Sequence, residues 1–400
     1  MSVEPFEITI PDRTLADLRE RLAYARFDPD GGAASDWSAG VSPRYLRDLV
    51  EYWRTSYDWR RREAALNDLP QFRARLRTSF GASNVHFIHV RGRGERPLPL
   101  VLTHGFPDSF LRFAKLIPLL TDPQAHGGAA EDAFDVVVPS LPGYAFSDRW
   151  QGQGGIFHVG DLWHRLMTEL GYRAYGAHGG DWGSTVTEQL GRSHADAVVG
   201  IHMTDVPFWH AFQPPHDATP AEARYLADNQ QFIVREGAYA AIQGTRPQTL
   251  ADSLNDSPAG LCAWLVEKFQ RWSDCGDFVE RRFSKDELLD NVMLYWVTET
   301  IASSFDPYFD LTHAGALRWI AEKAKEVAGS SKVPAGFTLF PKDLSHPPEE
   351  WAHRFYNVKR WREMSRGGHF AALEEPELLA AELRTFFRPL RPPGRASASA

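Results

Sequence analysis

The stretch His178-Gly-Gly-Asp-Trp-Gly-Ser184, "HGGDWGS", follows an apolar run and precedes a segment with helical periodicity. This change of pattern predicts a tight strand-to-helix turn with Asp181 at the bend. Gly179, Gly180 and Gly183 surround the aspartate, and residues without a Cβ let a backbone turn sharply and let a ligand approach closely. The stretch therefore predicts an accessible carboxylate at the end of a strand.

Asp181 stands where many hydrolases hold a serine on a strained strand-to-helix turn with the pattern G-x-S-x-G. No G-x-S-x-G occurs in the 400 residues. An aspartate has an unperturbed pKa of about 3.9 and needs no base for its own attack. It needs a strong electrophile, such as a strained sp³ carbon, and its attack leaves an alkyl ester. By itself Asp181 would equally suit a helix cap. Residues further along the chain therefore decide between a nucleophile and a cap.

Hydrolysis of such an ester requires a base and a group that orients the base. His369 lies in the glycine-flanked stretch "SRGGHFAALEEPEL", and Asp343 ends an apolar run in "FPKDLSHPP". The chain order of nucleophile, acid and histidine matches a known triad order. In that arrangement Asp343 would hold the His369 tautomer and stabilise the imidazolium. Four other acids lie near His369 in sequence, namely Glu349, Glu350, Glu374 and Glu375, and the last two also suit the start of the final helix.

The backbone amides of Phe106 and Trp182 are the predicted donors to the oxyanion of ester hydrolysis. Phe106 belongs to "LTHGFPDSF", which follows a predicted strand, and Trp182 follows the nucleophile. Loss of one such donor typically lowers the rate about a hundredfold or more. The following Pro107 permits a cis peptide bond, which the sequence alone does not decide.

Strand and helix patterns alternate from about residue 84, which predicts a mostly parallel sheet with helices on both faces. The predicted strands are 84–92, 98–105, 134–143, 174–180, 198–205 and 334–341, and the predicted helices between and after them are 109–120, 160–170 and 375–387. Helical periods at 14–27 and 42–53, each opened by a threonine or serine, predict an N-terminal helical segment.

The predicted organisation is an N-terminal helical segment (1–83), an α/β core (84–205 and 326–390), a helical insertion (206–325) and a disordered tail (391–400). The insertion is expected to form a lid over the carboxyl ends of the strands, where open α/β sheets hold their ligands. Phe106 and Trp182 are also predicted to contact the substrate. Phe208, Trp209 and Trp296 are candidates to line an apolar pocket there, although helix packing explains these three equally well.

Composition excludes several classes of partner. The formal net charge is −8 and no basic run occurs, which argues against nucleic acid and anionic lipid. Two cysteines, Cys262 and Cys275, give neither a disulfide framework nor a zinc pattern, so no metal is expected. No secretory signal or membrane-spanning run is apparent, and a cytoplasmic location is predicted.

Over nearly its full length the chain resembles the epoxide hydrolases of the α/β-hydrolase superfamily, in the branch that includes the microsomal and juvenile-hormone enzymes. The resemblance is carried by "PFEITIPDRTLADLRERLAYARF" and "DWSAGVSPRYLRDLVEYWR" in an N-terminal meander, by "GGDWGS" and by "RGGHFAALEEPELL". It implies an α/β-hydrolase fold with a helical lid. It also implies cofactor-free opening of an apolar epoxide by water to a vicinal diol, and a role in detoxification.

By the same resemblance, two tyrosines of the lid hold the epoxide oxygen and act as general acids. The matching stretches "REGAYAAIQGTRP" and "ASSFDPYFD" assign these roles to Tyr239 and Tyr308. A phenol with a pKa of about 10 is protonated at neutral pH and can donate to an alkoxide. Phe106, Asp108 and His178 depart from the residues common in relatives, which affects the expected substrate preference more than the chemistry.

Two alternatives remain open from the sequence. A haloalkane dehalogenase also uses an aspartate next to a tryptophan, but it holds a halide by N–H donors, whereas an alkoxide requires a proton donor. A catalytically silent ligand-binding protein on the same fold is the other alternative. The oligomeric state stays open between a monomer and a homodimer.

Overall fold

The computed structural model describes residues 3–28, 36–152, 155–212, 214–313 and 331–391. The predicted tail lies outside these residues except for residue 391. The described strands form one mixed sheet in the order β1-β2-β3-β5-β4-β7-β8-β9-β10, with β6 beside β3. Their bounds are β1 (Val3–Pro5), β2 (Gln71–Arg77), β3 (Gly81–Val90), β4 (Leu98–Thr103), β5 (Phe134–Pro139), β6 (Gln151–Gly152), β7 (Tyr175–Gly179), β8 (Val198–Met203), β9 (Pro334–Leu339) and β10 (Asn357–Glu363).

The part of the sheet from β5 to β10 is parallel, as predicted, and each of the six predicted strands is present. Two longer strands were not predicted from the sequence. β2 (QFRARLR) lies within the predicted helical segment, and β10 (NVKRWRE) lies at the end of the sheet. Both carry several charged residues, as strands near sheet edges often do, and this obscures the apolar pattern of a strand.

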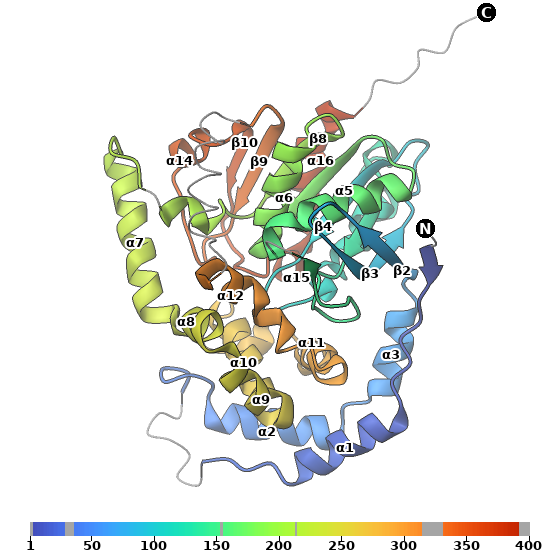
Figure 1. Cartoon of the computed structure of the whole chain (residues 1–400), viewed down its shortest axis with the longest axis vertical. Helices are drawn as coiled ribbons and strands as arrows, with labels where there is room; N and C mark the ends of the chain where they lie inside the picture. Colours follow the sequence, from blue (N-terminus) through green and yellow to red (C-terminus); the bar gives the residue numbers. More distant parts are fainter. Residues whose placement is uncertain (1–2, 29–35, 153–154, 213, 314–330, 392–400) are drawn as a thin grey trace, which may run out of the picture.

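Helices cover both faces of the parallel strands (Figure 1). A Cβ on Gly200 of β8 would meet Phe386 of α16 (Pro376–Phe387), whereas the next residue, Ile201, contacts Gly191 of α6 (Trp182–Ser193). Since successive side chains of a strand point to opposite faces, α6 and α16 lie on opposite sides. α5 (Val159–Glu169) packs beside α6, and α4 (Leu116–Thr121) packs beside α16.

The helix predicted at 109–120 is divided in the structure. A 3₁₀ helix at Phe110–Phe113 precedes α4, which begins at Leu116. Pro118 has no N–H and is tolerated only in a first helical turn, so the α-helix starts two residues before it. The remaining short helices that flank the sheet are α14 (Glu349–His353) and α15 (Ala371–Glu374).

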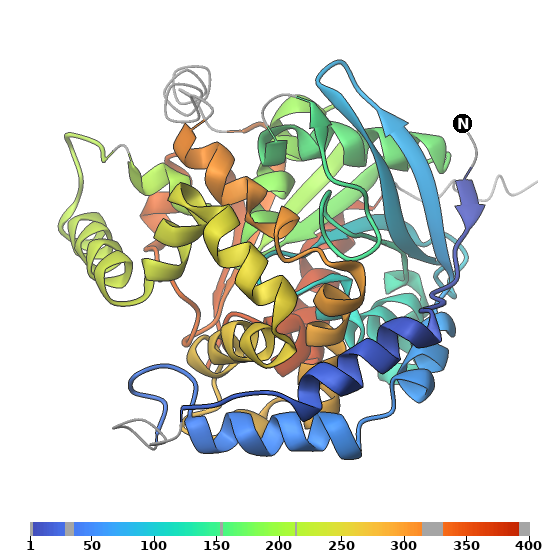
Figure 2. The same ribbon diagram turned by 60° about the horizontal axis from the view of Figure 1, so that its bottom comes forward.

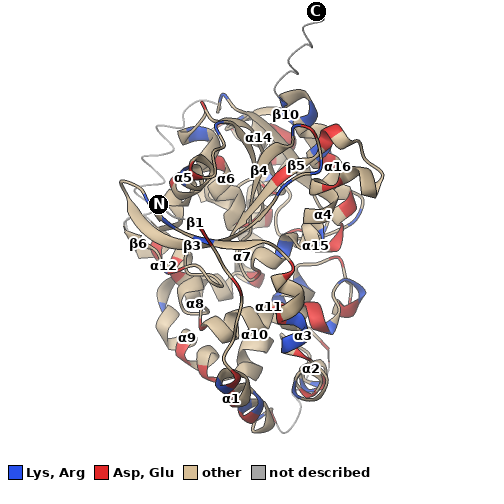
Figure 3. Ribbon diagram, turned by 90° about the vertical axis from the view of Figure 1, so that its right-hand side faces the viewer, with Lys and Arg blue, Asp and Glu red and all other residues tan. Residues whose placement is uncertain are grey.

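Three N-terminal helices lie between β1 and β2 along the chain: α1 (Asp12–Ala23), α2 (Pro43–Thr55) and α3 (Trp59–Asn67). Ser42 caps α2 by accepting a hydrogen bond from the amide of Tyr45, as predicted. The predicted cap Thr14 of α1 is wrong, because the helix begins at Asp12, directly after Pro11. Acidic and basic residues are interspersed along α1 and α2 (Figure 3).

A group of helices between β8 and β9 lies over the carboxyl ends of the parallel strands (Figure 1). It comprises α7 (Pro220–Glu236), α8 (Ala238–Thr245), α9 (Pro247–Asp256), α10 (Pro258–Arg271), α11 (Lys285–Thr298) and α12 (Asp306–His313). On the side away from the sheet, α1 and α2 pack against α10 and α11 (Figure 2). Among the described residues, none of the helices has the length and apolar character that a bilayer crossing requires.

Candidate active site

Asp181 lies at the sharp bend between β7 and α6. Its backbone has φ +60° and ψ −130°, a conformation that is costly for a residue with a side chain and that surrounding contacts must maintain. Close approach explains two of the neighbouring glycines. A Cβ on Gly183 would lie 2.0 Å from the carbonyl oxygen of Thr103, and a Cβ on Gly105 would lie 2.2 Å from Oδ1 of Asp181.

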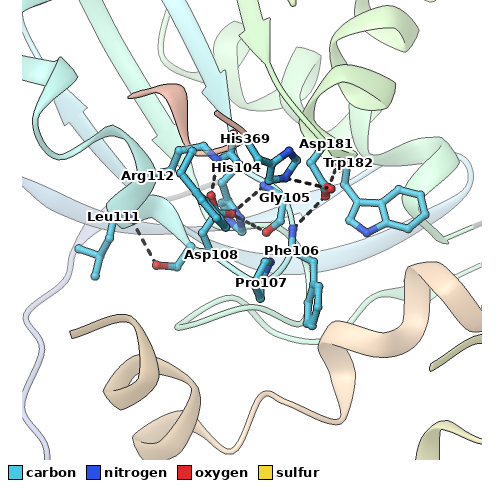
Figure 4. A network of polar contacts seen from close by, with 12 residues as sticks. His104, Gly105, Phe106, Pro107, Asp108, Leu111, Arg112, Asp181, Trp182 and His369 are labelled. Atoms are coloured by element: carbon cyan, nitrogen blue, oxygen red, sulfur yellow. Dashed lines mark hydrogen bonds and ion pairs between the residues drawn. The ribbon is translucent and has the colours of Figure 1, made fainter. Parts of the chain in front are cut away.

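The two predicted oxyanion amides both bind the Asp181 carboxylate (Figure 4). The N–H of Phe106 donates to Oδ1 at 2.9 Å, and the N–H of Trp182 donates to the same oxygen at 2.7 Å. The peptide bond from Phe106 to Pro107 is cis. Oδ1 is thus held between two donors, while the other oxygen, Oδ2, remains for a different contact.

That contact is His369, whose Nε2 lies 3.5 Å from Oδ2 of Asp181. The opposite ring nitrogen, Nδ1, lies 2.7 Å from Oδ1 of Asp343. The same oxygen accepts a hydrogen bond from the amide of Leu344, which fixes the direction of the carboxylate. The structure therefore brings Asp181, His369 and Asp343 into one line of contacts.

The four other acids near His369 in sequence have different partners. Glu374 accepts the amide protons of Asp274 and Phe370, and Glu375 pairs with Arg282 and Arg366. Glu350 accepts from the Thr219 hydroxyl, and Glu349 pairs with exposed His353. Asp343 is therefore the carboxylate that contacts the His369 ring.

Neighbouring charges shift the pKa values of both His369 and Asp181. Burial by itself lowers the pKa of His369, but the charges of Asp343 and Asp181 outweigh it and raise that pKa to about 10. For Asp181, burial by itself raises the pKa. The contact with His369 and the two amide hydrogen bonds outweigh burial and lower the pKa of Asp181. At neutral pH His369 is therefore an imidazolium and the Asp181 carboxyl group is ionised.

Tyr239 of α8 and Tyr308 of α12 both reach this site from the helical group. The Tyr308 ring lies 5.0 Å from the Trp182 ring and 5.6 Å from the Phe106 ring, centroid to centroid. Tyr239 lies 5.9 Å from Tyr308 and 6.1 Å from Phe106. Burial, together with the charge of Asp181, raises the pKa of both phenols. Both are therefore protonated O–H donors at neutral pH.

The three predicted pocket residues have separate locations. The Phe208 ring packs edge-on against Trp182, with centroids 5.4 Å apart, and so borders the site. Trp209 stacks on His210. Trp296 is covered by the guanidinium of Arg21 from α1, so the structure places it at the packing of N-terminal helices on α11 and not in the site.

Trp272 was not identified from the sequence, although its ring contacts both Tyr239 and His369, at 5.1 and 5.4 Å. Its carbonyl oxygen also accepts the amide proton of His369. Nothing in the stretch "FQRWSDCG" distinguishes this tryptophan from the twelve others in the chain. Only the packing of the helical group on the histidine loop shows its position.

Two departures from the family pattern are buried polar residues. Asp108 accepts a hydrogen bond from the amide of Gly105 and pairs with Arg112. Arg112 in turn donates to the carbonyl oxygen of His369 at 3.1 Å, so this pair joins the Phe106 loop to the histidine loop (Figure 4). His178 contacts His202 within the sheet.

The loop that carries Phe106 is also held by α11. The side-chain amide of Asn291 donates to the carbonyl oxygen of Pro107 at 2.8 Å, and its oxygen lies 3.0 Å from the Ser109 hydroxyl. The Tyr295 hydroxyl donates to the carbonyl oxygen of Asp108 at 2.8 Å. A helix far from the loop in sequence thus fixes the direction of an amide that binds Asp181.

Comparison with known proteins identifies related sequences over nearly the whole chain. Residues 3–113 match the family model "Epoxide hydrolase N terminus", and residues 99–293 match "alpha/beta hydrolase fold". A relative from Stigmatella aurantiaca is 44% identical over 97% of this chain and 86% of its own length. Epoxide hydrolase 1 of Sus scrofa is 35% identical over 96% and 88%. The structure of juvenile hormone epoxide hydrolase from Bombyx mori matches with a TM-score of 0.84 and 28% identity, covering 98% of this chain and 95% of that one.

Proposed function

Because the chain belongs to the epoxide hydrolase family and is an epoxide hydrolase with the α/β-hydrolase fold, we propose that Asp181 is its nucleophile. The observation that carries this proposal is the unequal environment of the two carboxylate oxygens. Oδ1 accepts both amide hydrogen bonds, whereas within the described part of the chain Oδ2 contacts the His369 ring. Oδ2 is therefore the attacking atom, and Oδ1 becomes the carbonyl oxygen of the ester.

In the first step, Oδ2 attacks a ring carbon of the epoxide and the carbon–oxygen bond of the ring breaks. The phenols of Tyr239 and Tyr308 hold the ring oxygen, and one of them transfers its proton to the alkoxide as the bond breaks. Proton transfer of this kind typically contributes about 10²- to 10⁴-fold to a rate. The product of the step is an alkyl ester of Asp181.

In the second step, His369 removes a proton from water through Nε2, and the water oxygen attacks Cγ of Asp181. Formation of the ester removes the negative charge of Asp181, which releases His369 from its ion pair and lowers its pKa relative to the free enzyme. Asp343 stabilises the imidazolium that forms. The oxyanion develops on Oδ1, between the amides of Phe106 and Trp182. As the bond between Cγ and Oδ2 breaks, the imidazolium gives the proton taken from water to Oδ2, and the diol leaves with Oδ2. The second proton of the water returns to His369, whose original proton has restored the phenol that donated in the first step.

The surroundings of the carboxylate favour an apolar substrate. The rings of Phe106, Trp182 and Trp272 adjoin the two tyrosines, and Phe208 packs against Trp182. Aromatic surfaces bind apolar groups while the few polar groups orient them. We further propose that the group α7–α12 serves as the lid of this site and that the N-terminal helices support the lid.

One turnover in heavy-oxygen water with excess enzyme tests the covalent step. Since water attacks Cγ, we expect the label to appear in the Asp181 carboxylate, and the diol of this first turnover to contain unlabelled oxygen from Oδ2. Mass spectrometry of the peptide containing Asp181 and of the diol measures both. Label in the diol alone would contradict an ester on Asp181 and indicate direct attack by water.

The substitution Asn291→Ala tests the support of the oxyanion amide by α11. Without the hydrogen bond to Pro107, the Phe106 amide loses its fixed direction, and small misplacements of such groups cost about tenfold to a hundredfold. We expect kcat to fall by that amount with a smaller change in KM. Asp286→Ala is the matched control, because it removes the Tyr52 hydrogen bond from the same helix without touching the loop. Equal kcat values for the two variants would exclude this role of Asn291.

A further inference from the structure

Asp205 lies directly after β8, beside the bend at Asp181, and the two-step reaction does not use it. Its Oδ1 accepts the backbone N–H of Asp181 at 3.1 Å, and its Oδ2 lies 2.8 Å from the hydroxyl of Ser184. The side chain is partly buried. It therefore contacts both the strained residue of the bend and the first turn of α6.

The Ser184 hydroxyl has two acceptors within hydrogen-bonding distance. Its Oγ lies 2.7 Å from the carbonyl oxygen of Asp181 and 2.8 Å from Oδ2 of Asp205. A hydroxyl has one proton, and a carbonyl oxygen can only accept. If Ser184 donates to Asp205, that carboxyl group can be ionised. If Ser184 donates to the Asp181 carbonyl, the contact with Asp205 is a hydrogen bond only when Asp205 carries a proton and donates it to Oγ.

The charges around Asp205 favour this neutral form. The carboxylates of Asp181 and Asp343 face it and repel a further negative charge, whereas the His369 imidazolium attracts one, and the nearby phenols of Tyr225 and Tyr356 are uncharged. Within the described part of the chain, no lysine or arginine forms an ion pair with it. Burial, with the charges of Asp343 and Asp181, raises the pKa of Asp205 to about 7 against the opposing effects of Ser184 and His369.

We propose that Asp205 acts as a neutral carboxylic acid and is the positioning residue of the nucleophile, an inference that rests on the proposed role of Asp181. Its carbonyl oxygen holds the N–H of Asp181 at the bend with positive φ. Its O–H, through Ser184, holds the helical turn that supplies the Trp182 amide. Because it is uncharged, it does this without placing another negative charge near the oxyanion of ester hydrolysis.

Asp205→Asn and Asp205→Ala separate a neutral acid from a carboxylate. An amide has the shape of the neutral acid, with one acceptor for Asp181 and one N–H donor for Ser184, so kcat is expected to stay within about threefold of the wild type. Alanine removes both bonds, and kcat is expected to fall about tenfold or more with little change in KM. Asp343→Asn is the contrasting variant, since that side chain must accept from the His369 ring, and we expect a loss of more than about a hundredfold.

A loss with Asp205→Asn as large as with Asp205→Ala would show that Asp205 is ionised and would overturn the proposal. A folded Asp205→Ala enzyme with wild-type kcat would show that the residue does not position Asp181.

Infrared spectroscopy observes the proton without relying on activity. The wild-type spectrum minus that of Asp205→Asn is expected to show the carbonyl stretch of a protonated carboxylic acid at about pH 6, and this band should disappear as the pH rises through about 7. Absence of the band would overturn the neutral acid even if Asp205→Ala failed to fold. If the heavy-oxygen test excluded Asp181 as nucleophile while the band was present, the failure would lie with the proposed mechanism and not with the protonation of Asp205.

Discussion

His369→Gln is expected to lower multiple turnover by about a thousandfold or more and to leave a stable ester on Asp181. Attack by Asp181 needs no base, because its carboxylate is already ionised, whereas attack by water on the ester needs Nε2 of His369. In this variant the ester should therefore form, but its hydrolysis should stop. A rapid first turnover with one equivalent of epoxide, followed by arrest, is the expected time course. Mass spectrometry should find the Asp181 peptide heavier by the mass of the epoxide.

His353→Gln is the matched control for this experiment, because His353 is exposed and pairs with Glu349. It should turn over like the wild type and accumulate no ester. The double variant His369→Gln with Asp181→Ala should form no adduct, which locates the ester. Loss of activity in His369→Gln without any adduct on Asp181 would place the histidine in the first step, or the nucleophile elsewhere.

The double variant Tyr239→Phe with Tyr308→Phe should lower the rate of ester formation by about a thousandfold. Phenylalanine keeps the ring contacts of both residues with Phe106, but it cannot give a proton to the alkoxide as the epoxide opens. Each single variant should lose less, because the remaining phenol still donates. Rapid mixing with excess enzyme, quenched before the ester hydrolyses, measures this step directly.

Tyr225→Phe is the control for the tyrosine pair. Tyr225 is also a buried tyrosine of the helical group, but its hydroxyl contacts Ser345, and its loss should leave ester formation unchanged. Retained epoxide opening in the double variant would remove Tyr239 and Tyr308 from the chemistry. Such a result would direct attention to N–H donors such as the Trp182 indole as alternative partners of the ring oxygen.

Local sequence patterns were sufficient for the parallel strands and for the bend. Apolar runs that end in glycines and acids mark β4, β7, β8 and β9, because buried parallel strands tolerate few polar residues. The same reasoning failed at β2 and β10, where exposed edges admit charges. It also failed at the start of α1, where Pro11 and not Thr14 precedes the helix.

Several site assignments depended on contacts that no local pattern contains. Asp343 and Asp205 both follow an apolar strand of the sheet. The chain order led to the prediction of Asp343 for the His369 ring, but that order fits either acid, and it does not predict the contact of Asp205 with the backbone of Asp181. The strand order separates them, since β9 carries Asp343 towards the histidine loop while β8 carries Asp205 to the neighbouring bend. The prediction for Trp296 failed because the sequence does not show which of two neighbouring elements an aromatic residue on a helix faces.

The sequence by itself determined that an aspartate occupies a glycine-lined bend after a buried strand, with a histidine loop near the chain end, since these features depend on neighbouring residues and on backbone conformation. Tertiary structure decided which carboxylate orients the histidine, which oxygen of Asp181 is free to react, and where Asn291 and Asp205 support the bend. Those properties arise from donors, charges and burial contributed by distant segments, and only folding brings such segments within hydrogen-bonding distance.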